Sequence, residues 1–135
     1  MLTSLERSLA ISHLIKEIIS SNEHIHFVSS INKNGRVTEY ELGNDRIITN
    51  MTKQEKEMLF MQRTLQNSLA KEFDDIIGPL DCITLQRETL LEFIFPYSEG
   101  LIFVLSDLEV IPRFLSKKIS LMLRDFEWMI STTLC

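Results

Sequence analysis

The most constraining feature of the sequence is the stretch LIFVL, residues Leu101 to Leu105, in which all five consecutive side chains are apolar. Side chains of a β-strand alternate between the two faces of its sheet, so a strand of this composition is apolar on both faces. Only a strand that is covered on both sides buries two apolar faces. The stretch therefore predicts a central strand in a sheet that has helices on both faces.

Three amphipathic helices are predicted to form these covering layers. Apolar residues recur at three-four spacing in each of them, which is the period of a helix with one buried face. The helices are expected over residues 4–20, 52–76 and 112–129. Thr52 and Glu55 have the spacing of a capping box, Gly78-Pro79 follows the second helix, and Pro112 occupies a favoured first position of the third.

The middle helix has a long apolar pattern. Its recurring apolar positions are expected to face the core, and they are Met58, Met61, Leu65, Leu69, Phe73 and Ile76. Leu59 and Phe60 lie beside this stripe, so the helix has more apolar residues than one narrow buried stripe needs. Surplus apolar surface of this kind is typical of a site that binds a partner.

Five strands are expected, over residues 25–31, 37–42, 81–86, 89–95 and 101–106. The first two flank Asn34-Gly35, a residue pair that fits a two-residue type I′ turn. This turn would pair Phe27 with Leu42, Ser29 with Tyr40 and Ile31 with Thr38. The face with Tyr40 and Leu42 is then expected to be buried, and the face with Glu39 and Glu41 is expected to be largely wet.

The order of elements is helix, two strands, helix, three strands, helix. This order indicates an α+β sandwich (α-β-β-α-β-β-β-α) with a five-stranded antiparallel sheet. A chain of 135 residues has the usual length of one domain, so we expect a single domain over residues 1–135. The share of apolar residues, 44%, and of charged residues, 24%, is ordinary for a globular protein.

Composition also argues against several classes of protein. Nucleic-acid binding needs a clustered basic surface, whereas the 14 Lys and Arg are scattered and the net charge is −5. Charged residues interrupt every apolar run before it reaches the roughly 20 residues of a bilayer span, and the N-terminal segment has no signal core. A cytoplasmic protein is therefore expected. Cys82 and Cys135 form no disulfide framework, so reduced thiols are expected, although a bond between them is left open.

The candidate chemical residues do not form a recognisable site. His24 and His26 are alternate residues that would share a face of the sheet. Asp45 is expected near His24, and Glu41 lies on the face of His26. Zinc, however, normally needs three or four ligands with supporting bonds. Cys82 has no neighbouring base in the sequence that would produce a thiolate. The four glycines occupy turn or cap positions and form no phosphate-binding loop. We therefore expect no enzyme activity, no cofactor and no metal.

The order of elements, over essentially the whole chain, resembles the Roadblock/dynein light chain superfamily, and especially its stand-alone prokaryotic members. The segments that carry the resemblance are FVSSINKNGRV, the middle helix that ends at Gly78, and GLIFVLSD before the closing helix. The resemblance implies a sheet order of 2-1-5-4-3. The last strand is then central, which agrees with the two apolar faces of LIFVL.

The resemblance also implies a non-enzymatic dimer that acts by contact, as a regulator, adaptor or scaffold for a small Ras-like GTPase. Members of the superfamily pair through the edges of their third strands and pack their middle helices together. The matching interface residues in this chain are Asp81, Cys82, Thr84, Gln86, Leu59, Phe60, Gln62 and Arg63. The third predicted strand has no proline that would block such edge pairing, which supports this expectation.

A ligand-sensing domain of the GAF or PAS type is the alternative, because such domains contain a similar mix of elements. A sensor needs a pocket between sheet and helices, with a few polar groups among apolar ones. Ser29, Thr38 and Tyr40 are the candidate polar contacts. An output domain, which a sensor of this type controls, is not expected within 135 residues.

Overall fold

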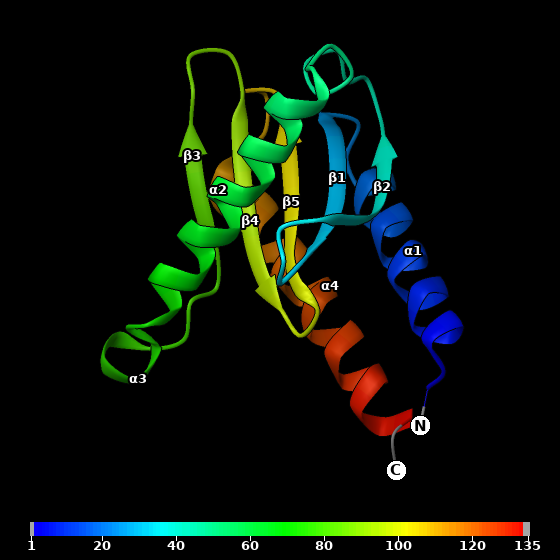
Figure 1. Ribbon diagram of the computed structural model, residues 1–135. Helices are drawn as coiled ribbons and strands as arrows, with labels where there is room; N and C mark the ends of the chain where they lie inside the picture. The colour runs from blue at the N-terminus through cyan, green and yellow to red at the C-terminus, as the bar shows by residue number, and fades with distance from the viewer. Residues whose placement is uncertain (1, 134–135) are drawn as a thin grey trace.

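Five antiparallel strands form one sheet in the order β2-β1-β5-β4-β3 in the computed structural model, which describes residues 2–133 (Figure 1). The strands are β1 (Ile25–Asn32), β2 (Val37–Leu42), β3 (Ile83–Gln86), β4 (Leu91–Tyr97) and β5 (Gly100–Ser106). The expected sheet order is confirmed. The LIFVL stretch lies in the central strand β5, whereas β2 and β3 form the two edges.

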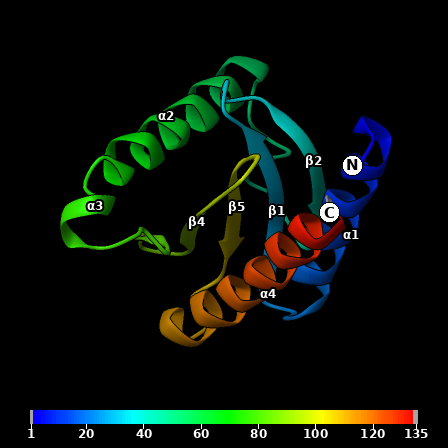
Figure 2. The same cartoon turned by 90° about the horizontal axis from the view of Figure 1, so that it is seen from below.

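The helices lie on both faces of the sheet, as expected (Figure 2). They are α1 (Ser4–Ser20), α2 (Lys53–Lys71), the short α3 (Asp74–Ile77) and α4 (Pro112–Thr133). Helices α1 and α4 lie side by side on one face, and α2 lies on the other. Thr52 caps α2 through the expected reciprocal bonds with Glu55, and α4 begins at Pro112.

Two hydrophobic cores result, one on each side of the sheet. On the side of α1 and α4 the core includes Ile102 and Val104, and on the side of α2 it includes Phe103. The rings of Phe27, Phe60 and Phe103 pack against one another with centroids 5.9–6.4 Å apart. Alternation along β5 therefore supplies both cores, which is why this strand has no polar position between Leu101 and Leu105.

The turn between β1 and β2 differs from the expected type I′ turn. A type I′ turn needs positive φ at both central residues, but Gly35 has φ 80° and no non-glycine residue within 2–133 has positive φ. The side chain of Asn32 accepts hydrogen bonds from the N–H groups of Asn34 and Arg36 instead. The pairing register then shifts between Ser30 and Ile31. The predicted pairs of Phe27 with Leu42 and of Ser29 with Tyr40 are confirmed. Ile31 lies opposite Val37, so its predicted pair with Thr38 was wrong.

The two faces of β2 are also the reverse of what the sequence suggested. Tyr40 and Leu42 are exposed, whereas Glu39 and Glu41 are half-buried. The physical reason is the placement of the helices: α1 packs against β1 and β2, whereas α2 contacts β4 and β5. The apolar face of β2 therefore lies at the margin of the α2 layer.

The predicted middle helix is divided into two pieces. Helix α2 ends at Lys71, Phe73 leaves the helical conformation with φ −97° and ψ 6°, and α3 follows. Gly78, with φ 101°, ends α3. Residues 52–76 thus form a long helix and a separate short one, so the expectation of one continuous helix was wrong.

Candidate functional site

The outer side of α2 carries a row of large apolar side chains, which we call the α2 stripe: Met58, Met61, Leu65 and Leu69. These residues recur at three-four spacing, and their exposed fractions lie between 51% and 62%. The opposite side of α2 buries Phe60 together with two polar residues, Arg63 and Asn67. The sequence-based expectation that the stripe faces the core was therefore wrong, since the more apolar side of the helix faces solvent.

An ion pair beneath α2 explains this orientation. Glu92 lies on β4 with its side chain buried, and its Oε1 is 2.8 Å from Nε of Arg63. The second carboxylate oxygen of Glu92 is 2.6 Å from Nε of Arg87. Rotating the α2 stripe toward the sheet would carry Arg63 away from Glu92 and leave a buried carboxylate without its buried partner, which is strongly unfavourable. Phe60 and Arg63 together therefore fix which side of α2 packs on the sheet.

The apolar surface continues past the end of α2. Phe73, Ile76 and Ile77 are exposed and follow the α2 stripe along the chain. They belong to the segment around α3, which lies beyond the C-terminal end of α2 on the side of the molecule where β3 forms the sheet edge (Figures 1 and 2). Exposed apolar side chains that gather on one side mark sites that contact other molecules, so this side of the molecule is the candidate contact site.

Strand β3 adds an open sheet edge near this surface. It pairs with β4 on one side only, and no residue within 2–133 pairs with its other side. The N–H of Arg87 donates to the carbonyl of Leu90, so the alternation of an antiparallel ladder directs the N–H groups of Thr84 and Gln86 outward. Such groups are available to pair with another strand.

The predicted interface residues occupy different environments. Thr84, Gln86 and Gln62 are exposed, and Cys82 and Leu59 are half-buried. Asp81 precedes β3, and its carboxylate accepts a hydrogen bond from Ser120 on α4. Phe60 and Arg63 lie on the side of α2 that faces the sheet, and their side chains are buried within this chain. The interface itself stays a prediction.

Sequence reasoning did not assign Met58, Met61, Leu65 and Leu69 to an exposed surface. The three-four periodicity correctly predicts one apolar side of the helix, but the prediction that this side faces the core is wrong. The signal that could have prevented this is Glu92, a charged residue in the otherwise apolar strand segment LLEFIF. A carboxylate in such a strand needs a cation from the covering helix. Arg63 is the helix residue that meets this need.

Cys82 is not equipped as a nucleophile. Burial raises the pKa of its thiol to about 11, so the thiol stays protonated at neutral pH. Its sulfur lies 3.7 Å from the hydroxyl of Thr84. Cys135, for which the sequence leaves a disulfide bond with Cys82 open, lies outside the described residues.

His24 and His26 meet a residue that the sequence did not suggest. Oδ2 of Asp107 is 3.0 Å from Nδ1 of His24 and 3.2 Å from Nε2 of His26. Asp45, which was expected near His24, accepts backbone N–H groups from its own loop instead. The hydrogen bond to Asp107 raises the pKa of His24. Among residues 2–133, no group of three His, Cys, Asp or Glu side chains is placed to hold a metal ion.

Ser29 and Tyr40 are cross-strand neighbours on one face of the sheet, but the polar residues considered for a sensor differ in their burial. Ser29 is fully buried, whereas Thr38 and Tyr40 are exposed on β2.

No helix within residues 2–133 is long and apolar enough to cross a membrane.

No family model matches the sequence, and no curated protein matches it either. The fold, however, matches solved structures. MglB of Myxococcus xanthus superposes with a TM-score of 0.69 at 12% identity, covering 98% of this chain and 96% of that one. A Roadblock/LC7 domain from Streptomyces avermitilis gives 0.66 at 11% identity, covering 89% and 97%. The gliding protein MglB of Thermus thermophilus gives 0.62 at 10% identity, covering 96% and 95%.

Proposed function

We propose that this chain, which has the Roadblock/LC7 fold, is a protein-interaction module without catalytic activity of its own. It forms a dimer of two copies and acts as a regulator or adaptor of a small Ras-like GTPase. The observation that carries the proposal is the α2 stripe, because an amphipathic helix that presents its more apolar side to solvent requires a partner to bury it.

The open edge of β3 supports a second copy as this partner. Antiparallel pairing of two identical edges generates a two-fold axis perpendicular to the sheet, so both copies keep α2 on the same face. Because α2 lies over β4 and β5, the two α2 helices then lie on the same face about four strand spacings, about 19 Å, apart. A helix with its side chains is about 10–12 Å across, so only a narrow gap separates the neighbouring sides of the two α2 helices.

The first experiment tests self-association. Size-exclusion chromatography with light scattering is run at tens of micromolar on the unaltered chain and on Leu65→Glu/Leu69→Glu. We expect a dimer for the unaltered chain and a monomer for the variant, because buried charges in an apolar interface are unfavourable. Leu121→Glu on α4, where Leu121 is also exposed, is the control and leaves the dimer intact. A monomeric unaltered chain contradicts the proposal.

The GTPase part of the proposal rests on the resemblance to the Roadblock superfamily, whose members regulate such proteins. It is tested with purified small Ras-like GTPases of the source organism, loaded with GTP. We expect one of them to bind the chain and to hydrolyse GTP at a changed rate, and the chain alone to hydrolyse none. If none of these GTPases binds, or the chain hydrolyses GTP by itself, this part is wrong.

A further inference from the structure

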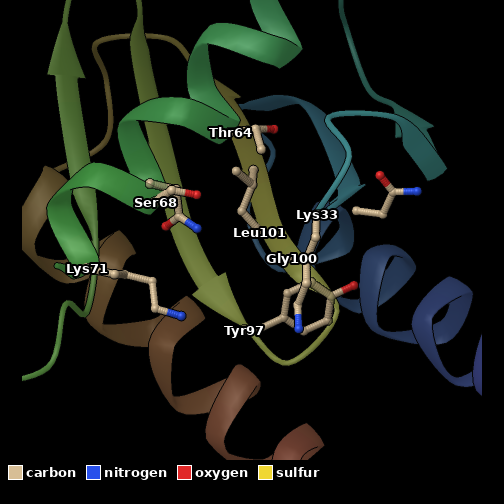
Figure 3. A pocket seen from close by; sticks show the side chains of 9 residues that line it. Lys33, Thr64, Ser68, Lys71, Tyr97, Gly100 and Leu101 are labelled. Carbon is tan, nitrogen blue, oxygen red and sulfur yellow. The ribbon is translucent and has the colours of Figure 1, made fainter.

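A pocket of about 340 Å³ opens between the C-terminal half of α2 and the turns at one end of the sheet (Figure 3). Its walls come from α2, from the turn between β1 and β2, and from the hairpin between β4 and β5. The residues that line it are Asn32, Lys33, Thr64, Asn67, Ser68, Lys71, Tyr97, Gly100 and Leu101. The pocket lies on the side of α2 toward the β1–β2 turn and does not include the α2 stripe.

Asn67 is the unusual residue of this pocket. It is only 7% exposed, it lines the pocket, and its side-chain Oδ1 accepts no hydrogen bond from any group within residues 2–133. Buried carbonyl oxygens in proteins are nearly always paired with a donor, because an unpaired one loses its hydration without compensation. A molecule in the pocket that donates a hydroxyl or amine hydrogen to Asn67 would supply this partner.

The charged residues of the pocket are both cationic. Lys33 enters from the β1–β2 turn and Lys71 from the end of α2, so that they border the pocket from different elements (Figure 3). None of the lining residues is acidic, and neither lysine forms an ion pair within residues 2–133. On a chain whose net charge is −5, this pairing of two lysines creates a local preference for an anion.

The remaining lining groups suit a small polar molecule. The hydroxyl of Thr64 donates to the carbonyl of Phe60, which leaves its oxygen free to accept from a ligand. The hydroxyl of Tyr97 bonds Ser30, which fixes the ring that forms part of the wall. Leu101 contributes apolar surface beside it. A few polar groups on a partly apolar wall are what small-molecule sites present.

We propose that this pocket binds a small organic anion that also carries hydroxyl or amine donors, such as a polyol phosphate or a hydroxy acid. The anionic group lies near Lys33 and Lys71, and a donor of the ligand bonds Oδ1 of Asn67. This inference goes beyond the proposed interaction function and does not depend on it, since the pocket is complete within one chain.

Amide chemical shifts of the ¹⁵N-labelled full chain provide the test. Glycerol 3-phosphate carries both an anionic group and donors, sulfate carries only the charge, and glycerol carries only donors. At constant ionic strength and up to about 10 mM, we expect glycerol 3-phosphate to shift the amides of Lys33, Asn67 and Lys71 saturably. Sulfate and glycerol are expected to bind at least about tenfold more weakly. Absence of saturable shifts, or equal binding of all three probes, overturns the proposal.

Two variants locate the binding. Lys71→Gln removes one charge at an exposed position and leaves the fold intact, and Asn67→Leu removes the unpaired acceptor at similar volume. Both are expected to weaken the binding of glycerol 3-phosphate about tenfold or more, whereas Lys117→Gln, an exposed position on α4, leaves it unchanged. Equal affinity of Lys71→Gln and Lys117→Gln overturns the assignment even if Asn67→Leu fails to fold.

Discussion

Glu92 connects three parts of the molecule through its two carboxylate oxygens. Arg63 reaches it from α2 and Arg87 from the turn between β3 and β4. The side chains of Glu92 and Arg63 are buried, whereas that of Arg87 is 60% exposed. We therefore expect the two ion pairs to contribute unequally to the stability of the fold, because only the pair of Arg63 and Glu92 is withdrawn from solvent.

This difference predicts unequal costs of removing the two arginines. Breaking a buried ion pair by removing one partner costs about 3–5 kcal/mol, so we expect Arg63→Met to lower the free energy of unfolding by about 3 kcal/mol. Arg87→Met is expected to lower it by less than about 1 kcal/mol, as for exposed pairs. Urea unfolding monitored by circular dichroism measures both. Equal losses for the two variants would show that the buried pair does not hold α2 in place.

A second residue-level prediction concerns His24. Its hydrogen bond to Asp107 raises its pKa above the ordinary 6.5. This interaction therefore stabilises the fold fully below pH 6.5 and ceases to do so as the pH rises through the raised pKa of His24. We expect Asp107→Asn to return the pKa of His24 toward 6.5 in an NMR titration. Glu23→Gln is the control. Oε1 of Glu23 lies 3.6 Å from Nε2 of His24, and the Glu23 side chain is 90% exposed, so we expect this variant to change the pKa of His24 little. An unchanged pKa in Asp107→Asn contradicts this account.

Among the elements, β3 makes the sharpest test of edge pairing. The N–H of Thr84 points away from β4, so replacing it by proline removes an outward donor and no bond of the existing ladder. We expect Thr84→Pro to abolish the dimer in light scattering at tens of micromolar. Thr84→Val retains the N–H and a β-branched side chain, and it is expected to dimerise like the unaltered chain. A dimer that survives Thr84→Pro unchanged rules out pairing through β3.

The elements themselves were largely predictable from the sequence, and their orientations were not. The apolar run in β5, the capping box at Thr52 and the proline that opens α4 are local signals, and each marked an element that the structure contains. The rotation of α2 is not a local property. Periodicity identifies two sides of a helix, but which side meets the sheet depends on the contact between Arg63 and Glu92, which are far apart in the chain.

The faces of β2 and the candidate pocket show the same limit. Tyr40 and Leu42 are exposed because α2 lies over β4 and β5, and no pattern within β2 specifies where that helix lies. The pocket brings together Lys33, Asn67 and Tyr97 from separate elements. Only the three-dimensional arrangement shows that the amide oxygen of Asn67 is buried and has no hydrogen-bond partner among the described residues.

At the level of the whole molecule, both hydrophobic cores are closed within a single chain. Neither core includes any residue of the α2 stripe. The stripe therefore does not contribute to the interior of the monomer. The proposed dimer would therefore differ from obligate dimers, whose monomers are unstable, and a variant that cannot dimerise should still fold.

This separation predicts how thermal stability depends on concentration. A dimer that dissociates on unfolding gains stability with protein concentration, and for two chains of 135 residues we expect the melting temperature to rise by about 2 °C per tenfold increase. Leu65→Glu/Leu69→Glu is expected to retain the circular dichroism spectrum of the unaltered chain and to melt at a temperature independent of concentration. Scanning calorimetry at several concentrations measures both. An unfolded variant would mean that the α2 stripe is required for the monomer fold, and a melting temperature of the unaltered chain that does not change with concentration would mean that no dimer forms.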